Sequence, residues 1–237
     1  MVTGVEKKIQ LFILPYAGGS IAAFKRFTEH IDNAIEVIVV EYPGRGTRAK
    51  EPLVENFNEL LSDAVSFCRE RRVTDLPFAV MGYSMGSILA YEIAAHNEIE
   101  GALEHLFIAA EISPKFRSAE LSNIGTATDD MILERAKMLG GLNESILLNK
   151  RFAEIYISPM LSDYRNFFGY RYGKDAGKIK ADATFFYCEK DTPKKKMEKW
   201  NDLIDGNTVF YEFGENHFFI NHHYKEMALV INETLCQ

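Results

Sequence analysis

Cysteine is scarce in this chain of 237 residues, which contains three. Cys68, Cys188 and Cys236 form no Cys-x-x-Cys pair and show no metal-ligand spacing, which argues against a disulfide framework and against a metal site. We interpret them as reduced thiols that fill space as small apolar residues, as expected in a cytoplasmic protein.

An excess of positive charge and a long apolar run are also missing. The net charge is −7, which argues against a general nucleic-acid binder, because such proteins gain affinity by neutralising phosphates. No apolar segment approaches the roughly 18 residues that span a bilayer, and the polar start of the chain does not resemble a secretion signal. The sequence thus predicts a cytoplasmic protein with no nucleic-acid or membrane partner.

Short apolar runs alternate with helical patterns along the chain. The runs cover residues 9–14, 35–40, 78–81, 106–110, 183–188 and 208–213, and helical spacing is found at 57–68, 195–203 and 223–235. This alternation predicts one α/β domain over residues 1–237, with a mostly parallel sheet, helices on both faces, and a site outside the carboxyl ends of the strands.

A long segment interrupts the alternation between the fourth and fifth predicted strands. It shows helical patterns at 129–139 and 146–155 and is rich in aromatic residues at 159–172. An insertion of this length in a compact domain is commonly a lid over the site, so residues of about 112–180 are predicted to form a mobile helical lid. Most of its aromatic side chains are expected to pack the lid onto the sheet, and one or two to line an acyl pocket.

The most informative motif is Gly82-Tyr83-Ser84-Met85-Gly86, which lies directly after an apolar run and before a helical pattern. Glycines on both sides of a serine allow the sharp strand-to-helix turn of a nucleophile elbow. A serine alcohol is a poor nucleophile at neutral pH, and this turn exposes it to a general base and to backbone N–H groups. Ser84 is therefore predicted to be a catalytic nucleophile.

A serine nucleophile needs a histidine base and an acid that orients it, in the order serine, acid, histidine on this type of fold. His217 follows the last predicted strand, where the base is expected, whereas His96 and His105 are poorly placed. Asp191 follows the strand before it and is the favoured acid. Glu111, which ends the strand at 106–110, is the alternative acid.

An oxyanion hole needs two convergent N–H donors. The residue after the nucleophile, Met85, supplies one, and Ala17 in the loop Pro15-Tyr16-Ala17-Gly18-Gly19 is predicted to supply the other. The sequence contains neither a Gly-x-Gly-x-x-Gly motif nor a lysine-bearing P-loop, so no cofactor and no metal are predicted.

Taken together, these motifs resemble those of the type II thioesterases, the stand-alone α/β-hydrolases that accompany nonribosomal peptide and polyketide synthases. The resemblance spans nearly the whole chain and rests on five ordered motifs: Leu14-Pro15-Tyr16-Ala17-Gly18-Gly19-Ser20, Tyr42-Pro43-Gly44-Arg45-Gly46-Thr47-Arg48, Gly82-Tyr83-Ser84-Met85-Gly86, Asp191-Thr192-Pro193 and Gly214-Glu215-Asn216-His217-Phe218-Phe219. It implies hydrolysis of acyl thioesters from the phosphopantetheine arm of carrier proteins, which removes misprimed or stalled acyl groups. It also implies Ser84, Asp191 and His217 as the triad, with Ala17 and Met85 as oxyanion donors.

The chain departs from the family pattern at two places beside the expected substrate channel. Ala109-Ala110-Glu111-Ile112-Ser113-Pro114 stands where the family usually has Ser-Gly-x-x-Ala-Pro, and Met160-Leu161-Ser162-Asp163 stands where it has Leu-Arg-Ala-Asp. The accepted acyl group is therefore left open. Two other functions also remain: an esterase or acyltransferase acting on a free small molecule with the same triad, and a catalytically silent protein that only binds.

A carrier protein is acidic, so an enzyme of net charge −7 needs basic residues around its site. The candidates are Arg45, Arg48, Lys115, Arg117 and the triplet Lys194–Lys196. We expect these side chains to be exposed near the entrance of the site.

Overall fold

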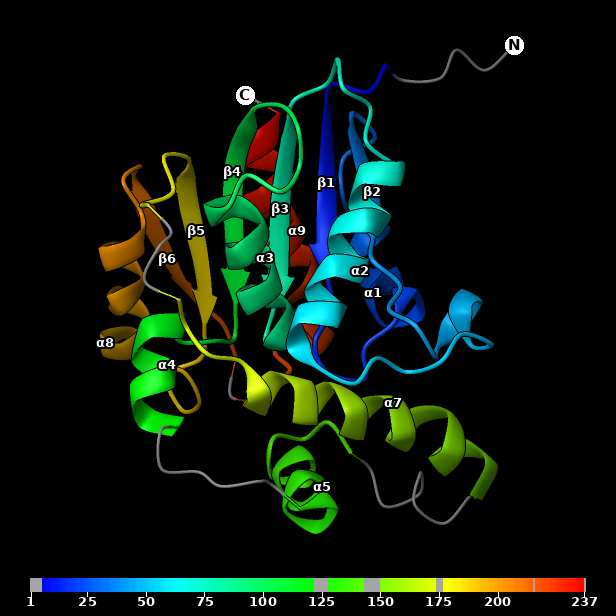
Figure 1. Ribbon diagram of the computed structural model, residues 1–237. Coiled ribbons are helices and arrows are strands. Elements are labelled where there is room, and N and C mark those ends of the chain that lie inside the picture. Colours follow the sequence, from blue (N-terminus) through cyan, green and yellow to red (C-terminus); the bar gives the residue numbers. More distant parts are fainter. Residues whose placement is uncertain (1–5, 122–127, 143–149, 174–176, 215, 237) are drawn as a thin grey trace.

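A parallel sheet forms the centre of the computed structural model, which describes residues 6–121, 128–142, 150–173, 177–214 and 216–236. Its strands are β1 (Ile9–Leu14), β2 (Ile35–Val39), β3 (Phe78–Tyr83), β4 (Leu103–Ala109), β5 (Asp182–Tyr187) and β6 (Thr208–Glu212). Their spatial order is β2-β1-β3-β4-β5-β6, and every neighbouring pair is parallel (Figure 1).

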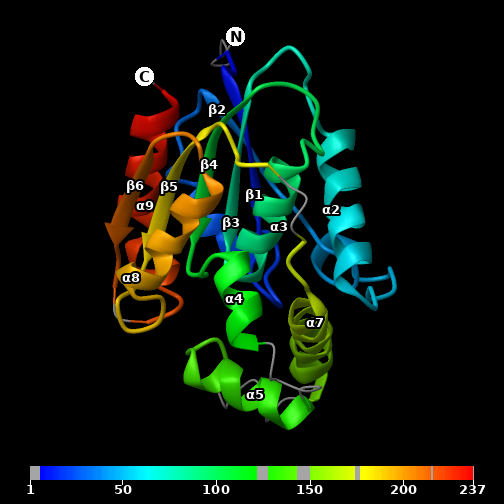
Figure 2. The same cartoon turned by 60° about the vertical axis from the view of Figure 1, so that its left-hand side comes forward.

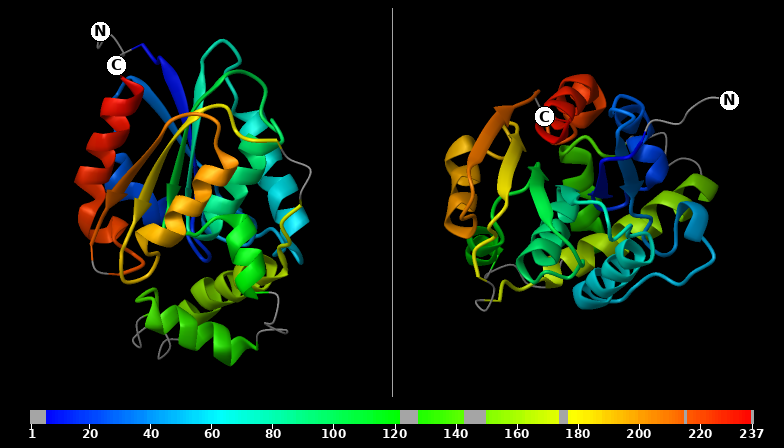
Figure 3. Two further views of the ribbon diagram at one scale, coloured as in Figure 1. Left: turned by 90° about the vertical axis from the view of Figure 1, so that its left-hand side faces the viewer. Right: turned by 90° about the horizontal axis from the view of Figure 1, so that it is seen from above.

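Helices cover both faces of this sheet (Figure 3). They are α1 (Ile21–Thr28), α2 (Phe57–Glu70), α3 (Met85–Ala95), α4 (Pro114–Leu121), α5 (Asp129–Met138), α7 (Lys150–Gly169), α8 (Lys194–Met197) and α9 (Ile220–Leu235), with 3₁₀ turns η1 (Gly46–Arg48) and η2 (Glu198–Leu203). One face packs against α2, α3, α8 and η2, and the other against α1 and α9. The predicted α/β architecture is confirmed. Within the described residues, no helix is both long enough and apolar enough to cross a membrane.

The central strands are buried from end to end. All six residues of β1 and all six of β3 are shielded from solvent, because an apolar cluster lies on each face of the sheet. Burial on both faces explains why these strands appear in the sequence as continuous apolar runs and not as alternating ones. It also fixes β3 firmly, and β3 leads directly into the predicted nucleophile.

In the described part of the segment between β4 and β5, helices α4, α5 and α7 lie beyond the carboxyl ends of the strands (Figure 2). Helix α7 is fastened to the body: Ser162 Oγ and Asn166 Nδ2 both donate to the carbonyl oxygen of Val54, at 2.9 and 3.1 Å. The predicted lid, 112–180, includes 122–127, 143–149 and 174–176, which lie outside the described residues.

A buried histidine in β4 gives the fold a defined response to acid. His105 Nε2 lies 2.9 Å from Thr184 Oγ1, and burial lowers the pKa of His105 to about 4, with Asp182 opposing the shift. The His105 imidazole therefore takes up a proton below pH 6.5 in the unfolded chain, but only near pH 4 in the folded chain. The neutral, buried His105 makes its full contribution to the free energy of unfolding above pH 6.5. This contribution is lost as the pH falls through 4, and the free energy of unfolding then decreases by about 3 kcal/mol at most.

We expect urea unfolding between pH 7 and pH 4 to show a smaller loss of stability in His105→Gln than in the unmodified protein. Glutamine can keep a hydrogen bond to Thr184 but takes up no proton. Equal slopes for the two proteins would show that another group carries the acid sensitivity.

Candidate active site

Ser84 lies on a strained turn between β3 and α3. Its backbone angles are φ 53° and ψ −119°, a conformation that costs a residue with a Cβ on the order of 1–3 kcal/mol. Glycine is required on both sides: a Cβ on Gly82 would overlap the carbonyl oxygen of Gly86, and a Cβ on Gly86 would overlap that of Leu14. The local sequence therefore forms the predicted elbow and presents the hydroxyl at the end of the sheet.

The structure brings Ser84, His217 and Asp191 into one hydrogen-bonded row. His217 Nε2 lies 3.0 Å from Ser84 Oγ, and His217 Nδ1 lies 2.6 Å from Asp191 Oδ2. A carboxylate can only accept, so Nδ1–H donates to Asp191 and leaves Nε2 free to accept the serine proton. Ser84 and His217 are 8 % and 6 % exposed, so little water competes for these bonds.

Short contacts to the backbone fix the acid and the base. Asp191 lies in a turn after β5, where its N–H and that of Thr192 donate to the carbonyl oxygen of Cys188 at 3.0 and 2.8 Å. Tyr83 OH donates to the carbonyl oxygen of His217 at 2.6 Å, and burial raises the pKa of Tyr83 well above its usual value. Tyr83, the residue before Ser84, thus holds the backbone of His217.

Glu111, the alternative acid, lies beside the row but has other partners. Its Oε1 is 3.6 Å from Arg117 Nε and accepts from the N–H of Ile112 at 3.2 Å. Burial raises the pKa of Glu111, and Arg117 partly offsets the effect. Within the described residues it is Asp191, and not Glu111, that is hydrogen-bonded to His217.

The predicted oxyanion donors lie on two segments that touch. A Cβ on Gly86 would come within 2.6 Å of the Pro15 carbonyl oxygen, so the start of α3 packs against the loop after β1. In the part of the chain that the structure describes, the backbone N–H groups of Ala17 and Met85 have no hydrogen-bond partner. An oxyanion hole requires two such unused donors that converge on one point.

One cavity contacts this row, and a second lies at the loop that carries Ala17. The first, of about 540 Å³, lies on the side of His217 and is lined by charged residues: Glu111, Arg135, Lys190, Asp191 and Lys196. The other, of about 340 Å³, reaches Ala17 and is mostly apolar, with Tyr16, Ala136, Leu142, Met160, Tyr164 and Phe218 in its wall. Tyr164 lines this cavity and is also buried in an apolar cluster with Ile132 and Met160, whereas Phe167 and Tyr170 are buried against the sheet. That one or two of the lid aromatics line an acyl pocket stays a prediction.

Three of the seven basic residues expected at the entrance are not available there. Arg45 and Arg117 are each 5 % exposed and are paired, with Asp163 and Glu111 respectively. Arg48 is bound by Asp63 and Glu51. For these arginines the expectation of exposed side chains is wrong, because each is paired with one or two carboxylates.

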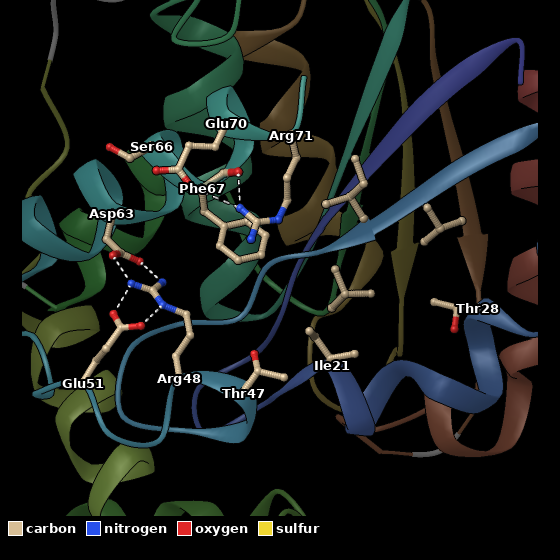
Figure 4. A pocket seen from close by; sticks show the side chains of 13 residues that line it. Ile21, Thr28, Thr47, Arg48, Glu51, Asp63, Ser66, Phe67, Glu70 and Arg71 are labelled. Carbon is tan, nitrogen blue, oxygen red and sulfur yellow. Dashed lines mark hydrogen bonds and ion pairs between the residues drawn. The ribbon is translucent and has the colours of Figure 1, made fainter. Parts of the chain in front are cut away.

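A larger cavity, of about 750 Å³, lies away from the row, along β2 and between α1 and α2 (Figure 4). Among its charged side chains, Arg48 contacts Glu51 and Asp63. The Arg71 guanidinium lies over the Phe67 ring, 3.6 Å from its centre. Arg48, one of the basic residues expected at the entrance, lines this cavity, but none of the predicted triad or oxyanion residues does, so size does not identify the site here.

Sequence reasoning missed Arg135 and Lys190, which line the charged cavity. Lys190 could have been found, because it directly precedes the favoured acid. Arg135 could not, because its place depends on how α5 packs beyond the end of the sheet. Lys115, Lys194 and Lys195 remain as the expected exposed basic side chains near this end of the molecule.

Comparison with known proteins gives consistent matches. Residues 9–235 match the model of the thioesterase domain family. The medium-chain S-acyl fatty acid synthase thioesterase of Anas platyrhynchos is 26 % identical over 96 % of this chain and 91 % of its own. The thioesterase PikA5 of Streptomyces venezuelae is 25 % identical, over 96 % and 81 %. The solved structure of the type II thioesterase BorB, from the borrelidin biosynthetic cluster, superposes with a TM-score of 0.80 at 26 % identity, covering 96 % of this chain and 93 % of its own.

Proposed function

The chain belongs to the thioesterase family, and from this premise we propose that it hydrolyses acyl thioesters held on the phosphopantetheine arm of carrier proteins. In nonribosomal peptide or polyketide biosynthesis, this reaction removes misprimed or stalled acyl groups. The observation that carries the proposal is the row Asp191–His217–Ser84, with its spacings of 2.6 and 3.0 Å. The relatives include enzymes of fatty acid and antibiotic synthesis, which supports a carrier-bound substrate.

In the proposed reaction, Ser84 Oγ adds to the thioester carbonyl carbon while its proton passes to His217 Nε2. The tetrahedral intermediate breaks the C–S bond, and His217 gives that proton to the departing sulfur. A water molecule then adds to the acyl-serine, with its proton taken by the same nitrogen. Cleavage of the C–O bond releases the carboxylic acid and returns the proton to Ser84. Asp191 stabilises the imidazolium that forms in each half.

The N–H groups of Ala17 and Met85 are proposed to hold the oxyanion in both halves. They have no partner in the described structure, so they lose no existing hydrogen bond when the negative charge appears. Removing one such donor from a serine hydrolase typically costs about 10²- to 10³-fold in kcat.

The two cavities suit the two ends of the substrate. The leaving thiol must lie beside His217, which protonates it, and the cavity on that side carries Arg135, Lys190 and Lys196. These cations suit the phosphodiester of the arm. The apolar cavity at Ala17 suits the acyl group. We propose that α4, α5 and α7 form the lid over both cavities, with α7 fastened to Val54 and α4 held through Arg117 to Glu111 and to the Phe167 carbonyl oxygen.

The proposal is tested by comparing a carrier-bound acyl thioester with a small acyl thioester of N-acetylcysteamine. Lys115→Glu and Lys195→Glu reverse exposed charges on α4 and α8. Each is expected to raise KM for the carrier substrate by about three- to tenfold at low salt and by less at high salt, because exposed charges are screened. Hydrolysis of the small thioester should stay within twofold.

Lys8→Glu is the matched control, since the same charge change lies at the amino end of β1, opposite the site. Release of the acyl group is followed by intact-protein mass spectrometry. Equal kcat/KM for carrier-bound and small thioesters, with no response to salt or to these variants, would contradict the carrier reading. An esterase or acyltransferase for free small molecules would then take its place.

A further inference from the structure

The two hydrogen bonds of the His217 ring leave one rotation of the ring uncontrolled. They bind Nδ1 to Asp191 and Nε2 to Ser84, which fixes the line through the two nitrogens, but the ring can still tilt about that line. The N–H bond and the lone pair lie in the ring plane and at an angle to the line, so a tilt turns both away from their partners. Hydrogen bonds weaken steeply as they bend. The tilt is therefore set by what packs against the ring.

Among the described residues, two aromatic rings pack against this imidazole at nearly right angles. The centre of the Tyr83 ring lies 6.2 Å from that of His217 at 88°, and the centre of the Phe218 ring lies 5.0 Å away at 82°. Edge-to-face contacts of this kind favour one relative orientation of two rings. Tyr83 is fully buried in β3, so its position is set by the sheet. Phe218 is half-buried, so its position depends on neighbouring segments.

Phe218 contacts both the loop after β1 and the end of the lid helix α5. Its ring packs against the Tyr16 ring, 5.0 Å away at 79°. On the lid side, a Cβ on Gly141 would come within 2.6 and 2.7 Å of Phe218 Cε2 and Cζ. The Gly141 N–H donates to the carbonyl oxygen of Ala136 at 2.9 Å, in the turn that ends α5. The end of α5 thus packs closely against the ring, and only a residue without a side chain fits there.

Helix α5 is attached to the body through α7 (Figure 2). Arg165 of α7 forms an ion pair with Asp129 of α5. An apolar cluster also joins the end of α5 to α7 through Ile132, Ala136, Leu142, Met160 and Tyr164. Helix α7 itself is bonded to the Val54 carbonyl oxygen. A continuous series of contacts therefore runs from the body through α7 and α5 to Phe218 and His217.

From these contacts we infer that Phe218 is a positioning residue for the base: it sets the tilt of the His217 ring, and it does so while α5 lies against it. Tyr83 holds the backbone of His217, and hence its distance from Ser84, independently of the lid. The lid thereby helps to orient the base in addition to covering the site. The inference rests on the proposed function, since the tilt affects turnover only if His217 acts as the base.

Gly141→Ala and Gly140→Ala separate this contact from the folding of the lid, because both add one methyl group to the turn that ends α5. At Gly141 the methyl group would overlap the Phe218 ring. At Gly140 it would meet no atom within 4 Å, but it strains a backbone with φ +83°. We expect Gly141→Ala to lower kcat for the small thioester about tenfold, with KM within threefold, because misorientation of a catalytic group acts on kcat. Gly140→Ala should keep kcat within about threefold while it lowers the melting temperature.

Phe218→Leu completes a double-mutant cycle with Gly141→Ala. Leucine keeps an apolar side chain beside Tyr16, but it has no ring to limit the tilt and is too short to meet the added methyl group. We expect Phe218→Leu alone to lower kcat about tenfold, and Gly141→Ala to cause no further loss in that background. Additive losses, or losses of kcat that follow the melting temperatures of the variants, would mean a structural role only and would overturn the inference.

A fluorophosphonate probe and proton NMR test the inference without a thioester. Ser84 Oγ bonds to the phosphorus of the probe, fluoride leaves, and His217 takes the serine proton. Labelling should be about tenfold slower in Gly141→Ala and Phe218→Leu but not in Gly140→Ala, and the Nδ1–H resonance of His217 should shift in the same two variants. Equal labelling rates or an unchanged resonance would refute the role of Phe218. Labelling of Ser84 in an enzyme that hydrolyses no acyl thioester would instead contradict the proposed function and leave that role intact.

Discussion

Replacing Ser84 with alanine is expected to lower kcat for thioester hydrolysis by about 10⁴-fold or more, because no other hydroxyl lies at the end of the row. Residual turnover would come from the oxyanion donors and from binding alone. The strain of the elbow arises from the Cβ, which alanine retains, so the melting temperature should change little. Steady-state kinetics with a small acyl thioester and thermal unfolding measure both effects.

Ser87→Ala is the matched control for this experiment. Ser87 lies on the same helix, and its hydroxyl oxygen is 2.9 and 2.8 Å from the carbonyl oxygens of Gly82 and Ala109, which share its single proton. Its loss should lower stability, since buried acceptors lose a partner, while kcat stays within a few-fold. A Ser84→Ala enzyme that kept a tenth of the activity would remove Ser84 from the mechanism.

Asp191→Asn is expected to lower kcat by about 10³- to 10⁴-fold with little effect on stability. The amide would present a donor or a weaker acceptor to Nδ1, which disfavours the tautomer that accepts the serine proton. Glu111→Gln should keep kcat within about tenfold, because Glu111 is paired with Arg117. The two variants are compared under identical conditions with the same small thioester.

The Asp191 and Glu111 variants can be compared directly because both carboxylates line the same cavity as His217. A severe loss in Glu111→Gln with a mild loss in Asp191→Asn would place the acid after β4 and not after β5. A severe loss in both would mean that Glu111 also contributes to the field at the imidazole.

The sheet could be predicted from the sequence because burial on both faces makes each central strand a continuous apolar run. The run at 9–14 coincides with β1, and the other strands differ from their predictions by a few residues at their ends. Helix α1 was missed, and the helix predicted at 195–203 is a short α8 followed by the 3₁₀ turn η2. These elements are short, so their periodic signal is weak compared with the effect of tertiary packing.

The order and spacing of the motifs correctly predicted that Ser84, His217 and Asp191 lie together, although their catalytic roles remain predictions. The resemblance to type II thioesterases is confirmed by the family match and by BorB. The burial and pairing of Arg45 could not be predicted, because its partner Asp163 lies 118 residues further along the chain, on a helix of the insertion. A charged residue in a Gly-rich loop suggests exposure unless its partner is known.

The hydrogen bond from Tyr83 to the His217 backbone affects how the site responds to heating. Tyr83 is covalently joined to Ser84 and belongs to β3, which is buried along its whole length. The spacing between hydroxyl and imidazole is therefore set by the interior of the sheet, even though the base lies in a surface loop. We therefore expect Ser84 and His217 to stay paired on warming that loosens the outer helices but leaves β3 intact.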